Sequence, residues 1–136
     1  MTGIGSVEMQ MLWWSVVLGL VQLVLSVLPS AQVRGFVWAS GPRDEPGAPL
    51  GRIGGRLERA FRNFLETFVF FVAAVLMVEI LGRHSSTSAL GAQIFFWARV
   101  AYVPTYAAGI PFLRTLLWSA SVVGIVMVLW DIYPGM

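Results

Sequence analysis

The sequence predicts an all-α membrane protein built as a bundle of four transmembrane helices. Of its residues 57% are hydrophobic and only 12% are charged, whereas soluble domains carry about 25% charged residues. Four apolar stretches are long enough to span, since about 20 residues cross a bilayer. Backbone groups in lipid must be satisfied within their own segment, which favours helices over strands. A length of 136 residues fits one integral membrane domain, 1–136.

The expected spans are bounded by residues that interrupt or start helices. The first stops at Pro29 and the second before Gly82, while Pro111 is a favourable first residue for the fourth. The first span is not expected to be a cleaved signal, because it lacks a basic start and a small-residue cleavage site. The approximate limits of the four spans are 8–28, 56–81, 89–108 and 111–133.

The distribution of arginine predicts the orientation of the spans. The loop 30–55 holds three arginines, and more follow at the start of the second span, whereas the opposite side has only Arg83. The positive-inside rule then places this loop in the cytoplasm and both termini outside. The loop is interpreted either as a solvated linker or as a lid over a cytoplasmic pocket.

One face of the second span is polar. On a helix, four of its residues fall within an arc of about 100°: Arg59, Arg62, Asn63 and Glu66.

A second polar stripe, on the third span, consists of Arg99, Tyr102 and Tyr106. Arg99 lies near the middle of its span, where a charge costs roughly 2.5–3.5 kcal/mol on insertion scales. Two arrangements would keep it ionised: an ion pair with Glu66, or a polar cavity that both residues share.

The groups on the two stripes suit a peptide-like anion that also carries an amine. Arginines bind carboxylates in a fork, a glutamate accepts an ammonium, and an asparagine pairs with amides. The competing interpretation is an interhelical salt bridge with capping at the membrane surface. No cysteine and one histidine exclude a thiolate or multi-histidine metal site within one chain. No long basic run indicates a nucleic-acid surface.

Polar residues at the outer ends of the spans are expected to be interfacial. We expect Glu79 and Asp131 at the membrane surface, His84 in solvent, and Trp118 in the aromatic belt. Glu8 lies at the very edge of the first span. This argues against a four-span multidrug exporter, since that class needs a carboxylate embedded in its first span.

The two stripes resemble motifs of the MAPEG family, the membrane-associated proteins in eicosanoid and glutathione metabolism. Residues 59–67 look like the second-helix signature of microsomal glutathione transferases and microsomal prostaglandin E synthase, and 98–106 like their third-helix signature. Residues 32–34 and 114–115 are similar to the end of the first helix and the start of the fourth. The chain departs from those relatives at Phe61 and Phe64, where they carry polar residues.

The resemblance implies a homotrimer in the lipid bilayer that binds glutathione as co-substrate between subunits, near the cytoplasmic side. Arg114 would stabilise the glutathione thiolate, or alternatively snorkel to the membrane surface, and Thr115 would supply a hydroxyl. The residues expected to bind glutathione are Arg34, Arg62, Asn63, Glu66, Arg99, Tyr102 and Tyr106.

The expected activity is glutathione transfer to hydrophobic small-molecule electrophiles, or reduction of hydroperoxides, without a metal. The alternative is a non-enzymatic lipid-binding or scaffold protein of the same fold. A bacterial inner membrane, with both termini periplasmic, is the expected location.

Overall fold

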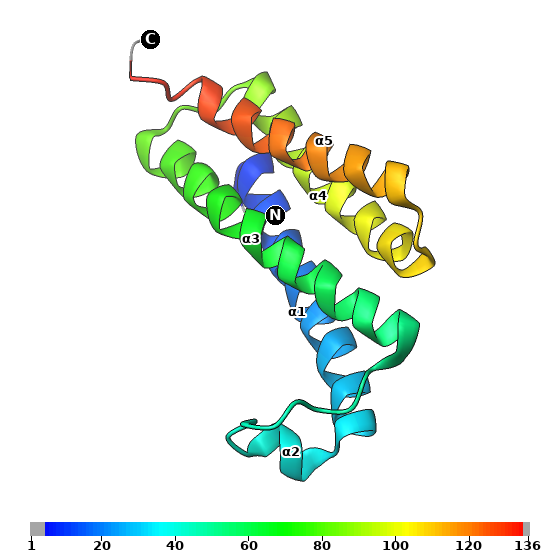
Figure 1. Cartoon of the computed structure of the whole chain (residues 1–136). Coiled ribbons are helices and arrows are strands. Elements are labelled where there is room, and N and C mark those ends of the chain that lie inside the picture. Colours follow the sequence, from blue (N-terminus) through cyan, green and yellow to red (C-terminus); the bar gives the residue numbers. More distant parts are fainter. Residues whose placement is uncertain (1–4, 135–136) are drawn as a thin grey trace.

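The computed structural model describes residues 5–134 as a bundle of antiparallel helices (Figure 1). No strand occurs among these residues, which confirms the all-helical class. A short helix, α2, lies beyond the end of α1 and outside the bundle (Figure 1). The helices are α1 (Val7–Arg34), α2 (Phe36–Ser40), α3 (Gly51–Leu81), α4 (Ser86–Ala108) and α5 (Pro111–Trp130).

Three of these helices, α1, α3 and α5, are long and apolar enough to cross a bilayer. α4 has 23 residues, enough for about 34 Å at 1.5 Å per residue, but it is not among the three apolar helices. Its sequence includes Arg99, two tyrosines and several hydroxyl residues, which lower its hydropathy. Length and composition therefore support three membrane spans. Whether α4 is a fourth span depends on how it packs against the other helices.

Two helices extend beyond the expected spans at the end of the bundle that carries the loop. α1 continues through Pro29 to Arg34 and ends at Gly35, whose φ of 85° stops it. The proline removes one backbone donor close to the end of the helix, so few bonds depend on it. α3 begins at Gly51, ahead of the expected Arg56. Of the expected loop 30–55, only residues 41–50 lie outside helices apart from the single residue Gly35.

Helices α4 and α5 pack against each other at a pair of glycines. A Cβ atom on Gly91 would lie 2.6 Å from the carbonyl oxygen of Gly124 and 2.6 Å from Cβ of Met127. A Cβ atom on Gly124 would lie 2.5 Å from the carbonyl oxygen of Gly91. Small residues allow such close approach of helices in a membrane. Neither position has room for a side chain.

Aromatic rings fill the centre of the bundle. The rings of Phe71 on α3 and Phe95 on α4 stack with centroids 4.0 Å apart, and Phe64 packs near Phe95 at 6.5 Å. α1 contributes a different kind of face to this core. Its buried residues are mostly polar, while most of its large apolar side chains are exposed, as expected of a helix surrounded by lipid. The buried set comprises Glu8, Leu12, Ser15, Gln22 and Ser26.

Substitution of Gly91 or Gly124 by alanine tests the close packing of α4 on α5. We expect each variant to lose about 1–3 kcal/mol of stability from overpacking, measured as a lower melting temperature in detergent. Gly55→Ala is the matched control, because the nearest atoms to its Cβ belong to the flexible guanidinium of Arg59. Unchanged melting temperatures for both Gly91→Ala and Gly124→Ala would contradict the packing described.

Candidate functional site

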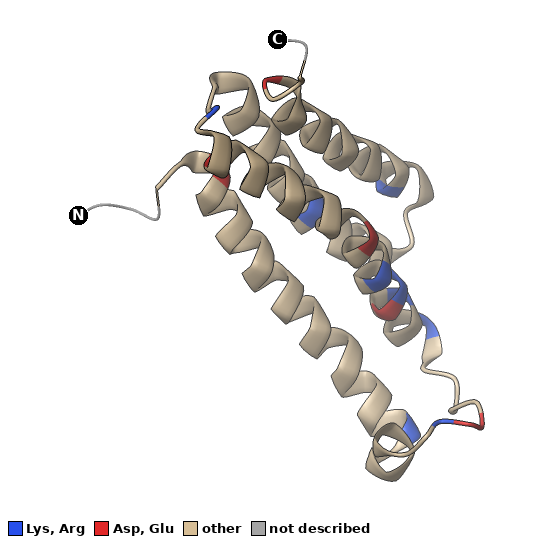
Figure 2. Ribbon diagram, turned by 90° about the vertical axis from the view of Figure 1, so that its left-hand side faces the viewer, with Lys and Arg blue, Asp and Glu red and all other residues tan. Residues whose placement is uncertain are grey.

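A polar cavity of about 390 Å³ lies between α3, α4 and α5. Its volume falls within the range of roughly 300–1,000 Å³ that is common for small-molecule sites. Its walls come from the first half of α3, the second half of α4 and the first half of α5. The charged positions of α3, except Glu79, lie along the same part of that helix (Figure 2). The lining residues are Arg59, Arg62, Asn63, Glu66, Tyr102, Tyr106, Arg114, Thr115 and Trp118.

The cavity brings together seven of the nine residues that the sequence indicated as a site. The polar stripe of α3 forms one wall, and the two tyrosines of α4 form another. Arg114 and Thr115, at the start of α5, face the same space. Their roles in ligand binding and catalysis stay predictions. The two that do not line the cavity are Arg34 and Arg99.

Arg99 lies behind the wall of the cavity rather than on its surface. Its side chain is 1% exposed, and its Nη2 donates to Oδ1 of Asn63 at 2.7 Å. The guanidinium also lies over the Tyr102 ring, 4.4 Å from its centroid. An amide oxygen and an aromatic face both attract the cation, while its Nε and Nη1 are buried without a hydrogen-bond partner among the described residues. Arg99 therefore positions two cavity residues from behind.

The expected ion pair between Arg99 and Glu66 is not formed within residues 5–134. Asn63 occupies the place of that carboxylate as the partner of Arg99. Glu66 is exposed and faces the cavity instead. Of the two arrangements expected, the ion pair is absent among these residues, and the cavity is lined by Glu66 but not by Arg99. The Glu66 carboxylate is therefore available to a ligand.

Arg114 is the cation of the α5 wall. Its guanidinium lies over the ring of Tyr106, 4.9 Å from the centroid, and no carboxylate of residues 5–134 pairs with it. Across the cavity, Nε of Arg59 donates to the Tyr106 hydroxyl at 3.3 Å. The Thr115 hydroxyl donates to the Pro111 carbonyl at 3.2 Å. Arg114 thus presents an unneutralised charge to the cavity.

Arg34 lies apart from the cavity. Its Nη1 is 3.7 Å from Oε2 of Glu58, and its Nε donates to the Ala48 carbonyl at 2.9 Å. The guanidinium also lies over the ring of Trp38, 5.0 Å from the centroid. Within one chain, Arg34 therefore fastens the loop after α2 to the end of α1.

Trp118 and Arg59 line the cavity although the sequence did not single them out as ligand-binding residues. Trp118 was interpreted as part of the aromatic belt. A signal for Trp118 was present, since it follows Arg114 by four residues and so shares its face of the helix. Arg59 belongs to the polar stripe of α3, which indicates the same surface.

Phe61 and Phe64 point away from the cavity. Phe64 is buried in the core, and its ring stacks on Phe68 with centroids 4.9 Å apart. Phe61 is partly buried and packs against the same core. These departures from the resembled motif therefore alter helix packing and leave the polar lining intact.

Comparison with known proteins supplies the family. A model of the MAPEG family matches residues 11–133, a range that contains every residue of the cavity. Neither the search of curated proteins nor that of solved structures returned a match. Three helices of the chain are long and apolar enough to cross a bilayer, and the family match spans nearly the whole chain. The protein is therefore an integral membrane protein that belongs to the MAPEG family.

Proposed function

We propose that the protein is a glutathione-dependent transferase or peroxidase that acts on lipophilic electrophiles or hydroperoxides. The observation that carries the proposal is the polar cavity between α3, α4 and α5, in which the charge of Arg114 is left without a carboxylate partner among the described residues. Membership of a glutathione and eicosanoid family supports the same class.

The groups on the α3 wall complement the polar groups of glutathione. Glutathione carries two carboxylates, one ammonium, two amides and a thiol. Arg62, whose side chain is 66% exposed, pairs with Glu58 at 3.5 Å, and it would fork a carboxylate of the ligand with its remaining donors. Glu66 offers a carboxylate to the ammonium, and Asn63 offers its amide nitrogen to a carbonyl while its oxygen is held by Arg99. The tyrosine hydroxyls add further hydrogen bonds.

Arg114 would stabilise the ionised thiol. A free thiol has a pKa of about 8.5, and an adjacent cation lowers it, so that more of the reactive thiolate is present at neutral pH. The thiol proton passes to water. The thiolate then attacks an electrophilic carbon and the leaving group departs, or it attacks a hydroperoxide oxygen and releases an alcohol. In the second case, a second glutathione reduces the resulting sulfenic acid and water is released.

Four membrane spans and a trimer belong to the same proposal. α4 packs closely on α5 and buries Arg99 against α3, so it is shielded by both apolar helices and would cross the bilayer with them. The cavity would then lie at the cytoplasmic side, with both termini outside a bacterial inner membrane. Arg34 lies off the cavity of its own chain, and in a trimer it would contribute to the site of a neighbouring subunit.

Arg114→Ala tests the role of the cation. We expect the ultraviolet absorbance of the glutathione thiolate, seen on adding glutathione to the wild-type protein, to disappear in the variant. We also expect kcat/KM for conjugation of a reactive aryl halide to fall by about 100-fold. Arg52→Ala, which removes an exposed arginine remote from the cavity, should retain both signals. If the wild type showed neither the thiolate absorbance nor conjugation, the proposed enzymatic activity would be refuted and a lipid-binding scaffold would be favoured.

Glu66→Gln tests which end of glutathione meets α3. Loss of a carboxylate opposite the ammonium should weaken glutathione binding by about tenfold, measured by calorimetry on detergent-solubilised protein. N-acetylglutathione has no ammonium, so wild type and variant should bind it equally. The same loss of affinity for both ligands would place the ammonium elsewhere.

A further inference from the structure

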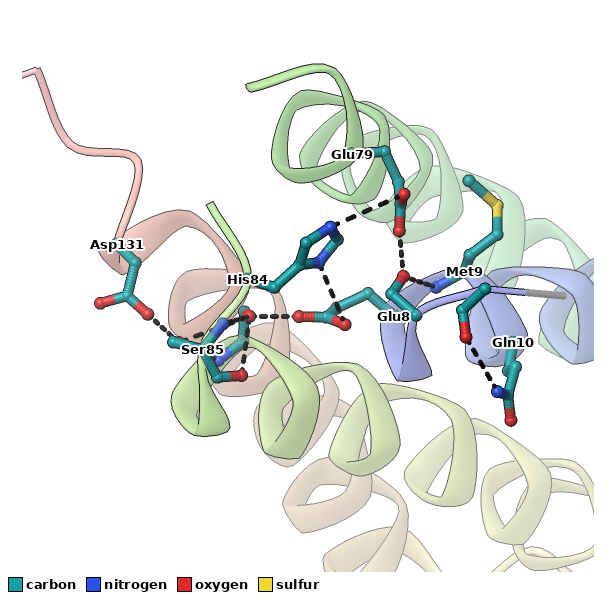
Figure 3. Close-up of polar contacts among 10 residues, drawn as sticks. Glu8, Met9, Gln10, Glu79, His84, Ser85 and Asp131 are labelled. Carbon is teal, nitrogen blue, oxygen red and sulfur yellow. Dashed lines mark hydrogen bonds and ion pairs between the residues drawn. The ribbon is translucent and has the colours of Figure 1, made fainter. Parts of the chain in front are cut away.

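A second polar cluster lies at the opposite end of the bundle, where α1 and α4 begin and α3 and α5 end (Figure 3). None of its members lines the cavity. At its centre His84 lies between two carboxylates. Nδ1 is 3.5 Å from Oε2 of Glu8, and Nε2 is 3.7 Å from Oε2 of Glu79.

His84 was expected in solvent, and its side chain is 39% exposed, although it also lies close to carboxylates on two helices. Glu8 was expected at the edge of the first span, and it is the second residue of α1. The sequence did not indicate that Glu8 is buried, with 2% of its surface exposed. It is buried because the turn between α3 and α4 folds back over the start of α1, as Figure 3 shows.

Hydroxyl groups hold the two carboxylates in place. The Ser88 hydroxyl donates to Glu8, and the Ser6 hydroxyl donates to Glu79. Ser6 is also the N-cap of α1, since its side-chain oxygen accepts from the Met9 amide at 3.1 Å. Glu79 is therefore connected both to His84 and to the first turn of α1.

The two carboxylates beside His84 interact differently with a charged ring and with a neutral ring. A neutral imidazole has one N–H and one lone pair, whereas an imidazolium donates at both nitrogens. Each ring nitrogen here faces a carboxylate, so a neutral ring would point a lone pair at one of them. The charged ring attracts both carboxylates, and the neutral ring leaves them to repel each other.

We propose that His84 is a proton-dependent clip that joins the start of α1 to the end of α3. The other charged groups of the cluster are Asp131, which accepts from the Ser85 hydroxyl, and Arg83, whose Nη1 donates to the Asp131 carbonyl at 3.3 Å. They fasten the end of α5 to the same turn but contact neither ring nitrogen. Loss of the His84 proton opens the clip, and the first turn of α1 loosens while the cavity at the other end stays assembled.

The sign of the pH dependence follows from this geometry. The attraction to both carboxylates exists only while the ring is charged, so the clip contributes stability while His84 carries its proton and contributes none once the ring is neutral. Imidazole changes charge between about pH 5 and 8. His84 is the single histidine of the chain.

Thermal unfolding of the full-length protein in detergent at pH 5.5 and 8 tests the clip. We expect the melting temperature of the wild type to fall by about 3 °C across this interval. His84→Gln should lower the melting temperature at pH 5.5 and make it independent of pH. Equal pH dependence in wild type and variant would overturn the proposal.

Amide hydrogen exchange shows where in the chain the loss of the His84 proton loosens the structure, and it does not require the protein to be unfolded by heat. After correction for the intrinsic pH dependence, amides of residues 7–12 should exchange roughly fivefold faster at pH 8 than at pH 5.5 in the wild type. His84→Gln and Glu79→Gln should exchange at the fast rate at both pH values. Glu45→Gln, which alters an exposed loop acid, should behave as wild type. A wild type that shows no change over residues 7–12, or the same change over 111–120, would refute a local clip.

Discussion

Hydrocarbon around the helices imposes the constraint on which the rest of this structure depends. Apolar side chains gain nothing by leaving lipid, so the exterior is apolar and the polar groups collect inside or at the ends of the bundle. α1 follows this rule clearly, with Ser15 and Gln22 turned inward and its large aliphatic residues turned outward. The same rule divides the interior into three layers. A polar cavity lies at one end, an aromatic core in the middle and the His84 cluster at the other end.

Two arginines on neighbouring helices illustrate how burial decides a role. Arg99 donates to Asn63 and lies over the ring of Tyr102. It therefore positions two residues that line the cavity but does not line the cavity itself. Arg114 is only partly buried and meets an aromatic face alone. Arg99 is buried behind the cavity and holds two lining residues in place, whereas Arg114, which lacks a carboxylate partner among the described residues, is available to an anionic ligand.

The sequence predicted the helical class and the faces that form the cavity, because both depend on hydropathy and on a period of 3.6 residues. It did not predict which residues meet across helices. The periodicity places Arg99 and Glu66 on polar faces, but the relative rotation of α3 and α4 decides that Asn63 is the partner. The sequence did not indicate the contacts of His84 or the position of Trp118 beside the cavity, for a similar reason. The local sequence indicates only that both residues lie near the ends of spans. The contacts of His84 depend on the conformation of the turn between α3 and α4, and those of Trp118 on how α5 packs.

The glycine contact between α4 and α5 has a consequence for how the chain enters the membrane. α4 alone would expose Arg99 to lipid at a cost of roughly 2.5–3.5 kcal/mol, and it is less apolar than its neighbours. α5 is apolar, and the short connection from Ala108 to Pro111 brings it directly against α4. In the four-span arrangement that we propose, the two helices would leave the translocon as one hairpin. The fit of Gly91 against Gly124 would then be an early event in biogenesis as well as a feature of the finished bundle.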